Sequence, residues 1–258
     1  MNPLHPCVLL IGSLLAVGLA YAEGAADVHR DENAMAAARA RLRTHMGGQR
    51  FAMAAMERFE YQSHEGDGRW LWDAGVSYGS DLHKLWLKTE GEYQVEANAA
   101  EEAELQALYS RAISPYFDLQ LGYRVDLEPD PERHFFVLGV QGLAPYWLEV
   151  DAAAFVSEDG DLSARVEAEY DLFLTQRLIL QPRAEMNLAA QDVSDYGVGS
   201  GVSTVEAGLR LRYEFRRQFA PYVGVAWLGR FGETADLAQR HGEQRNAWSV
   251  LGGVRFWF

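Results

Sequence analysis

Charged residues occupy every second position in several stretches of the chain, and their type and spacing could do chemistry. Acidic and basic residues alternate with apolar ones within 84–93, 103–113, 162–174, 177–188 and 205–215. Side chains two residues apart in a β-strand point to the same face, so each stretch has a charged face and an apolar face. We predict that the charged faces line one interior, with the side chains Lys88, Glu90, Glu92, Glu104, Arg165, Glu167, Glu169, Asp171, Arg183, Glu185, Glu206, Arg210, Arg212 and Glu214.

These charged faces allow two interpretations. Rings of carboxylates attract cations in pores, so the acids could form a cation-attracting lumen. The alternative is ion pairing that plugs and stiffens the interior. Its basic partners would be Lys88, Arg124, Arg165, Arg183, Arg210, Arg212 and Arg255. Both signs of charge occur within single stretches, and this interleaving favours ion pairing. Carboxylates also suit hard cations better than soft ones.

The elements that must position these side chains are β-strands. From about residue 51 onward, apolar and polar residues alternate in about twelve stretches, several of them longer than the usual strand of about five or six residues. They are 56–63, 69–76, 84–93, 103–113, 117–127, 134–143, 147–156, 162–174, 177–188, 205–215, 220–231 and 247–258. In the last stretch Val250, Val254, Phe256 and Phe258 share one face, which is typical of the closing strand of an outer-membrane barrel.

The connections between the stretches alternate in length. Short ones lie at 114–116, 144–146, 175–176 and 216–219, and longer polar ones at 94–102, 128–133, 189–204 and 232–246. Short turns on one rim and long loops on the other are typical of bacterial outer-membrane barrels. A soluble sandwich would show the same alternation along each strand, but aromatic residues near the strand ends also favour a barrel. We therefore predict an all-β fold, an antiparallel transmembrane β-barrel of about twelve strands.

The chain divides into three predicted segments. Residues 1–22 are expected to be a signal peptide, because the apolar run 8–19 is followed by the small-residue pattern Ala20-Tyr21-Ala22. No Lys or Arg precedes that run, and a membrane anchor is the alternative, although the run is short for a span of about 30 Å. Residues 23–50 are expected to be a short N-terminal periplasmic extension, helical or disordered. Residues 51–258 form the predicted barrel.

Composition and motifs argue against several classes of protein. The formal charge of −14 disfavours a nucleic-acid partner, which needs a basic face. The single cysteine, Cys7, would be removed with the signal peptide, so the mature chain has no thiolate chemistry. No Gly-x-Ser-x-Gly frames a serine, and the glycine-rich stretch 197–201 lacks the Lys and Ser/Thr of a phosphate loop. We predict that the protein is not an enzyme; an outer-membrane lipase or acyltransferase is the weaker alternative.

Long ordered motifs of the chain resemble the copper resistance protein B family. They include Arg58-Phe59-Glu60-Tyr61, Leu85-Trp86-Leu87-Lys88-Thr89-Glu90-Gly91-Glu92, Val137-Leu138-Gly139-Val140-Gln141-Gly142-Leu143-Ala144-Pro145-Tyr146, Leu174-Thr175-Gln176-Arg177-Leu178-Ile179-Leu180-Gln181-Pro182-Arg183 and Glu206-Ala207-Gly208-Leu209-Arg210-Leu211-Arg212-Tyr213-Glu214. The resemblance implies an outer-membrane protein of a Gram-negative bacterium that binds, sequesters or passes copper ions in periplasmic copper homeostasis, beside a periplasmic multicopper oxidase. We expect a monomer in outer-membrane lipid with both termini in the periplasm. The alternative is a small structural barrel or porin without specific copper binding.

Copper ligands are the remaining expectation from this resemblance. Members of the family commonly carry a Met- and His-rich segment ahead of the barrel, and thioether and imidazole groups suit Cu(I). This chain has few such residues there, and the candidate metal ligands are His29, Met35, His45, Met46, Met53 and Met56. They are scattered without a repeat, so ordinary apolar roles for the methionines are the alternative. The oxidation state of the bound copper, Cu(I) or Cu(II), stays open.

Overall fold

The computed structural model describes residues 31–46, 49–64, 67–240 and 242–258, and the chain forms two units, Met1–Gly48 and Gln49–Phe258. In the first unit, helix α1 spans Glu32–Met46. The carboxylate of Asp31 accepts a hydrogen bond from the Asn33 backbone N–H at 3.0 Å, which caps the helix, and the Ala- and Arg-rich sequence favours helix. The predicted signal peptide, residues 1–22, lies outside the described residues.

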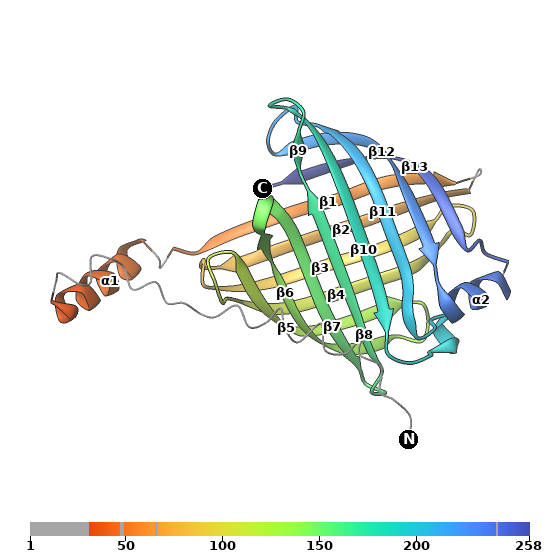
Figure 1. Cartoon of the computed structure of the whole chain (residues 1–258), viewed down its shortest axis with the longest axis horizontal. Coiled ribbons are helices and arrows are strands. Elements are labelled where there is room, and N and C mark those ends of the chain that lie inside the picture. The colour runs from red at the N-terminus through yellow and green to blue at the C-terminus, as the bar shows by residue number, and fades with distance from the viewer. Residues whose placement is uncertain (1–30, 47–48, 65–66, 241) are drawn as a thin grey trace, which may run out of the picture. The chain divides into compact units, whose positions relative to one another are not determined.

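The second unit is built almost entirely from β-strands (Figure 1). They are β1 (Phe51–His64), β2 (Asp67–Gly79), β3 (His83–Gln94), β4 (Ala99–Ala112), β5 (Phe117–Glu128), β6 (Arg133–Ala144), β7 (Leu148–Ser157), β8 (Leu162–Tyr170), β9 (Leu172–Phe173), β10 (Leu178–Ala189), β11 (Gly201–Tyr213), β12 (Phe219–Arg230) and β13 (Asn246–Trp257). Within the described residues, no helix is long and apolar enough to cross a membrane.

The strands close into a barrel. Neighbours in sequence pair antiparallel, and β1 pairs with both β2 and β13, which joins the two ends of the sheet. The short β9 and the longer β8 are separated by Asp171 and both pair with β10, so together they fill one position in the wall. The wall is therefore a closed antiparallel barrel of twelve strand positions, as the sequence predicted.

The two faces of the wall have opposite character. Large apolar side chains such as Leu85, Leu121 and Val250 are more than half exposed on the outer face. Glu60 and Arg210, by contrast, are among the most deeply buried side chains of the molecule. A soluble sandwich would bury the apolar faces and expose the charged ones. The observed polarity excludes that alternative, because it is the polarity of a barrel that faces lipid.

The connections lie on two rims. The first rim, where β1 begins and β13 ends, carries the turns 80–82, 113–116, 145–147, 174–177 and 214–218. The second rim carries 95–98, 129–132, 158–161, 190–200 and, with α2 (Gly232–Arg240), the described residues between β12 and β13.

The predicted long loops 94–102 and 128–133 are each shorter than expected, because strand residues occupy both of their ends and leave four-residue connections at 95–98 and 129–132. β3 ends at Gln94 and β4 begins at Ala99. β5 ends at Glu128 and β6 begins at Arg133.

The predicted polar loop 232–246 contains a helix, α2 (Gly232–Arg240). Its side chains Thr234, Ala235, Leu237 and Ala238 are buried, so tertiary packing stabilises a helix that the polar composition concealed.

Candidate functional site

Two rows of carboxylates face each other across the lumen. In each row the acids are direct cross-strand partners, so they lie side by side on the inner face. The first row, on β2 to β5, is Asp73, Glu90, Glu104 and Asp126. The second row, on β7, β8, β10 and β11, is Asp151, Glu167, Glu185 and Glu206. Like charges directly opposite each other destabilise a sheet, so each row needs compensating cations.

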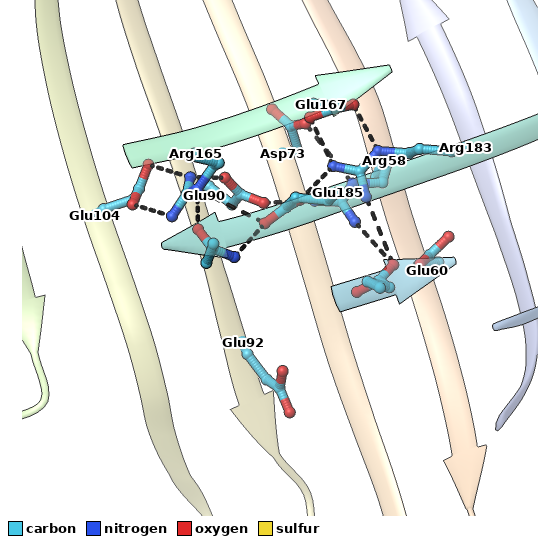
Figure 2. A network of polar contacts seen from close by, with 12 residues as sticks. Arg58, Glu60, Asp73, Glu90, Glu92, Glu104, Arg165, Glu167, Arg183 and Glu185 are labelled. Atoms are coloured by element: carbon cyan, nitrogen blue, oxygen red, sulfur yellow. Dashed lines mark hydrogen bonds and ion pairs between the residues drawn. The ribbon is translucent and has the colours of Figure 1, made fainter. Parts of the chain in front are cut away.

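Arginines from several strands supply this compensation (Figure 2). Arg165 on β8 bonds to Glu90 at 2.8 Å and to Glu104 at 3.1 Å, and therefore ties the second wall to the first. Arg58 on β1 pairs with Glu90 in the first row, and its guanidinium also lies 3.8 Å from Glu206 in the second row.

Arg183 serves the second row. It pairs with Glu167 at 2.5 Å, with Glu185 at 2.7 Å and with Glu206 at 3.5 Å. Its side chain is only 4% exposed, so these contacts are formed away from bulk solvent. One guanidinium therefore bridges three neighbouring carboxylates and reduces their mutual repulsion.

The two rows and their cations form what we call the ionic layer, which comprises the eight row carboxylates with Arg58, Lys88, Arg124, Arg165, Arg183 and Arg210. It separates two cavities. The first-rim cavity, of about 490 Å³, is lined by first-rim residues such as Tyr116 together with Arg58 and Arg183. The second-rim cavity, of about 540 Å³, is lined by second-rim residues such as Pro129 together with Arg58 and Arg165.

The second-rim cavity is strongly acidic. Its lining contains eleven carboxylates and six guanidinium groups. Glu92 and Glu102 are direct cross-strand partners there, and Arg69 bonds to Glu92 at 2.9 Å. A cavity with this excess of negative charge and low-dielectric walls concentrates cations.

Helix α2 and the loop 190–200 border this cavity, since Tyr196, Thr234 and Ala238 belong to its lining. The hydroxyl oxygen of Thr234 accepts a hydrogen bond from the Gly199 backbone N–H at 2.8 Å, and both groups are buried. A Cβ on Gly199 would lie 2.6 Å from the Thr234 backbone nitrogen, so the helix and the loop approach as closely as they do because residue 199 is glycine.

Polar contacts within the loop 190–200 support this arrangement. The carboxylate of Asp192 accepts a hydrogen bond from the Ser200 backbone N–H at 2.6 Å, and this bond to the ionised form lowers the pKa of Asp192 below its ordinary value. The Arg133 guanidinium lies 4.2 Å from the centre of the Tyr196 ring and pairs with Asp161. The loop is therefore attached to the barrel wall by a cation–π contact.

The structure places the side chains that the sequence predicted for the interior as follows. Lys88, Glu90, Glu104, Arg165, Glu167, Arg183, Glu185, Glu206 and Arg210 belong to the ionic layer. Glu92 lines the second-rim cavity and Glu169 the first-rim cavity. Asp171 and Arg212 pair with each other, and Glu214 lies in the turn that follows β11.

Among the interior residues that sequence reasoning missed are Arg58, Glu60, Asp73 and Asp151. The spacing of Arg58, Glu60 and Gln62 is a period-two signal that could have been used. It is interrupted by a bulge in β1 between Met56 and Arg58, which shifts the alternation. The inward-facing positions that follow Asp73 in β2 and Asp151 in β7 hold small or apolar residues. The alternation of charged and apolar residues is therefore weak in these two strands.

The candidate metal ligands are distributed over both units of the chain. His29 lies outside it, Met35 is in α1, and His45 and Met46 form the last two positions of that helix. Met53 and Met56 are in β1, opposite Ser77 and Ala74 on β2, and a spacing of three residues places them on different faces of the wall. Among the described residues, no group of three or more His, Cys, Asp or Glu side chains could hold a metal ion.

A closed antiparallel wall with an apolar outer face and a charged lumen defines a porin-like outer-membrane β-barrel. The fold is similar to a solved structure of the NanC porin in a rhombohedral crystal form, with a TM-score of 0.51 and 12% sequence identity over 79% of this chain and 98% of that chain.

Sequence comparison identifies the family. The family model described as copper resistance protein B precursor (CopB) matches residues 50–258. Copper resistance protein B of Escherichia coli is 41% identical over 206 residues, which cover 80% of this chain and 69% of that protein. A copper resistance protein B homolog of Pseudomonas syringae pv. tomato (strain ATCC BAA-871 / DC3000) is 42% identical over 202 residues, covering 78% and 68%. The chain belongs to the copper resistance protein B family, and fold and family together indicate an outer-membrane protein with a role in copper resistance.

Proposed function

We propose that the barrel contributes to copper resistance by binding copper ions in its lumen and by holding or passing them at the outer membrane. The observation that carries the proposal is the second-rim cavity, with eleven carboxylates against six guanidinium groups in its lining. Membership of the copper resistance protein B family supports copper as the cation. The proposed function contains no bond-making or bond-breaking step.

The chemistry of the lumen favours Cu(II) over Cu(I). Carboxylate oxygens are hard ligands, whereas Cu(I) prefers thioether and imidazole groups. A Cu(II) ion in the cavity would exchange part of its water shell for carboxylates such as Glu92 and Glu102, which lie opposite each other. Such binding would be weak and reversible, because arginines already occupy many of the carboxylates, and that suits temporary retention or passage.

The N-terminal extension is proposed to hold copper separately. His29, Met35, His45 and Met46 combine imidazole and thioether groups, the ligand set for Cu(I). With both termini in the periplasm, this segment would meet periplasmic copper proteins, and a multicopper oxidase of the same resistance system is the partner we propose. The barrel would act as a monomer in outer-membrane lipid.

Copper titration of the refolded protein in detergent tests the proposal. The full chain is compared with a variant that lacks residues 23–48, and each is titrated with Cu(II) and, under reducing conditions, with Cu(I). We expect Cu(II) binding to be retained on truncation and Cu(I) binding to be lost. Loss of both on truncation would place all binding in the extension, and no binding by either form would leave the barrel without a direct copper role.

A second candidate function is a structural barrel or small porin that does not bind copper specifically. The extensive ion pairing of the lumen favours it, because paired carboxylates are poor metal ligands. A strain that lacks the protein distinguishes the two functions: reduced copper tolerance restored by the wild-type protein supports the copper role. Unchanged tolerance would support the structural barrel.

A further inference from the structure

A third, smaller cavity lies within the ionic layer, between the two large ones. It measures about 80 Å³, enough for a few water molecules. It shares Asp73, Lys88 and Glu167 with the first-rim cavity, and it shares Glu104 and Arg165 with the second-rim cavity. This connecting cavity therefore lies between the two large ones and borders both.

Two cationic side chains cross the connecting cavity in opposite directions. Lys88 on β3 bonds to Asp151 on β7 at 2.9 Å. Arg165 on β8 reaches back to Glu90 on β3 at 2.8 Å and to Glu104 on β4. Lys88 on the first wall reaches Asp151 on the second, and Arg165 on the second wall reaches the first, so both side chains span the connecting cavity.

Lys88 and Arg165 are the most exposed cations of the ionic layer. Their side chains are 22% and 19% exposed, that of Arg124 is 14% exposed, and those of Arg58, Arg183 and Arg210 are 7%, 4% and 2% exposed. Water in the lumen reaches the first two, so an entering ion can displace them. Displacing the buried arginines would leave desolvated charges unpaired, at a much larger cost.

The charge of the connecting cavity sets the kind of ion that can enter. Its lining contains five carboxylates, Asp73, Glu90, Glu104, Asp151 and Glu167, against the two cations Lys88 and Arg165. When either bridge opens, the local charge becomes more negative. A cation that enters can replace the displaced ammonium or guanidinium as the partner of these carboxylates, whereas an anion has no such partner.

We infer that Lys88 and Arg165 form an ionic gate that closes the lumen to free ion flow and admits cations that compete for their carboxylates. The inference rests on the proposed function for the identity of the cargo, a divalent copper ion. The gate makes passage selective without a dedicated metal-binding site, because a divalent ion competes for paired carboxylates better than K⁺ does.

Ion currents through single proteins in planar lipid bilayers, with KCl on both sides, test the gate. The variant Lys88→Gln/Arg165→Gln removes both bridges. We expect its K⁺ conductance to be at least about tenfold above that of the wild type, with a reversal potential in a salt gradient that shows cation preference. The matched control is Arg69→Gln/Arg255→Gln, which removes the same charge from the two large cavities and leaves the connecting cavity intact.

Folding of each variant is checked by heat-modifiable electrophoretic migration. If the double variant does not fold, Lys88→Gln/Asp151→Asn removes one bridge without leaving a charge unpaired, and it should also raise the K⁺ conductance. An unchanged conductance in folded variants, an equal rise in the control or a preference for anions would overturn the gate. Because the probe is K⁺, failure of copper binding leaves this result unaffected, and failure of the gate leaves the copper titration unaffected.

Discussion

Arg210 on β11 donates two hydrogen bonds to Glu60 on β1, at 3.0 and 2.8 Å, although the two residues are 150 positions apart in the chain. The Tyr222 hydroxyl and the Gln62 amide also donate to the same carboxylate. Closure of the barrel through β13 brings β11 and β1 this close. The pair is 2% and 0% exposed, so neither charge can turn to solvent if the other is removed.

Arg210→Met should therefore destabilise the barrel strongly. Removing one partner of a buried ion pair costs about 3–5 kcal/mol, because the remaining charge stays buried and unpaired. Urea unfolding in lipid vesicles, followed by tryptophan fluorescence, measures the loss. The matched control is Arg245→Met, whose pair with Asp236 is half exposed and should change the free energy of unfolding by less than about 1 kcal/mol. Equal effects at the two positions would contradict this account.

Gly122 on β5 should not tolerate a larger residue. A Cβ at this position would overlap the Ala107 carbonyl oxygen and lie 2.8 Å from the Leu108 Cα on the paired strand β4. Gly122→Ala forces the two strands apart and should cost about 1–3 kcal/mol in the same unfolding assay. Gly252→Ala is the control, because its nearest neighbour, the Tyr222 carbonyl oxygen, is 3.9 Å away. The prediction is wrong if both variants unfold alike.

Leu121, in the middle part of β5, should face the hydrocarbon of the membrane. Its side chain is 59% exposed on the apolar outer face. Leu121→Lys should destabilise the barrel folded in phosphatidylcholine vesicles by about 2–4 kcal/mol, which is the cost of a lysine near the bilayer midplane. Leu82, in the first-rim turn between β2 and β3, is 52% exposed, and Leu82→Lys should be tolerated because the turn lies at the rim of the barrel. An outer face that accepts Leu121→Lys without cost would argue against a lipid-facing wall.

Thr234 should fix helix α2 to the loop 190–200. Thr234→Val removes the acceptor of the buried Gly199 N–H, and the backbone group is left without that bond. Hydrogen exchange followed by mass spectrometry should show faster exchange in the peptide that contains Gly199. Thr175→Val also removes a side-chain acceptor of backbone N–H groups, but on the first rim, and should leave exchange at Gly199 unchanged. Unaltered exchange at Gly199 in the first variant would count against this role.

Asp192 should make the order of the same loop depend on pH. Its pKa is lowered, so the hydrogen bond from Ser200 N–H stabilises the loop above the ordinary carboxyl pKa, and that stabilisation is lost as the pH falls through the lowered pKa. Asp192→Ala removes the bond at every pH. Exchange at Ser200 should therefore be faster in the variant near neutral pH, and the difference should disappear in acid. A difference that persists in acid would show that the carboxylate charge is not responsible.

Much of the architecture could be predicted from the sequence because membrane strands carry a strong local pattern. The alternation in 117–127, 162–174 and 205–215 identified β5, β8 with β9, and β11. Counting all such stretches gave the twelve strand positions of the barrel wall. The predicted strand 56–63 began five residues too late, since Ala54 and Ala55 are too small to mark a face. Helix α2 was missed because its stability comes from buried contacts on the barrel and its sequence is polar.

The charged side chains of the interior could be listed from their spacing, but their partners could not. Period two is the same for a strand with its charged face in water and for one with its charged face in a lumen. Closure of β1 on β13 decided between them. The register of the paired strands then placed the carboxylates in rows. Lys88 and Asp151, which pair across the lumen, are 63 residues apart in the chain. A local pattern describes one strand, whereas an ion pair across a barrel depends on where all the strands between its partners have been placed.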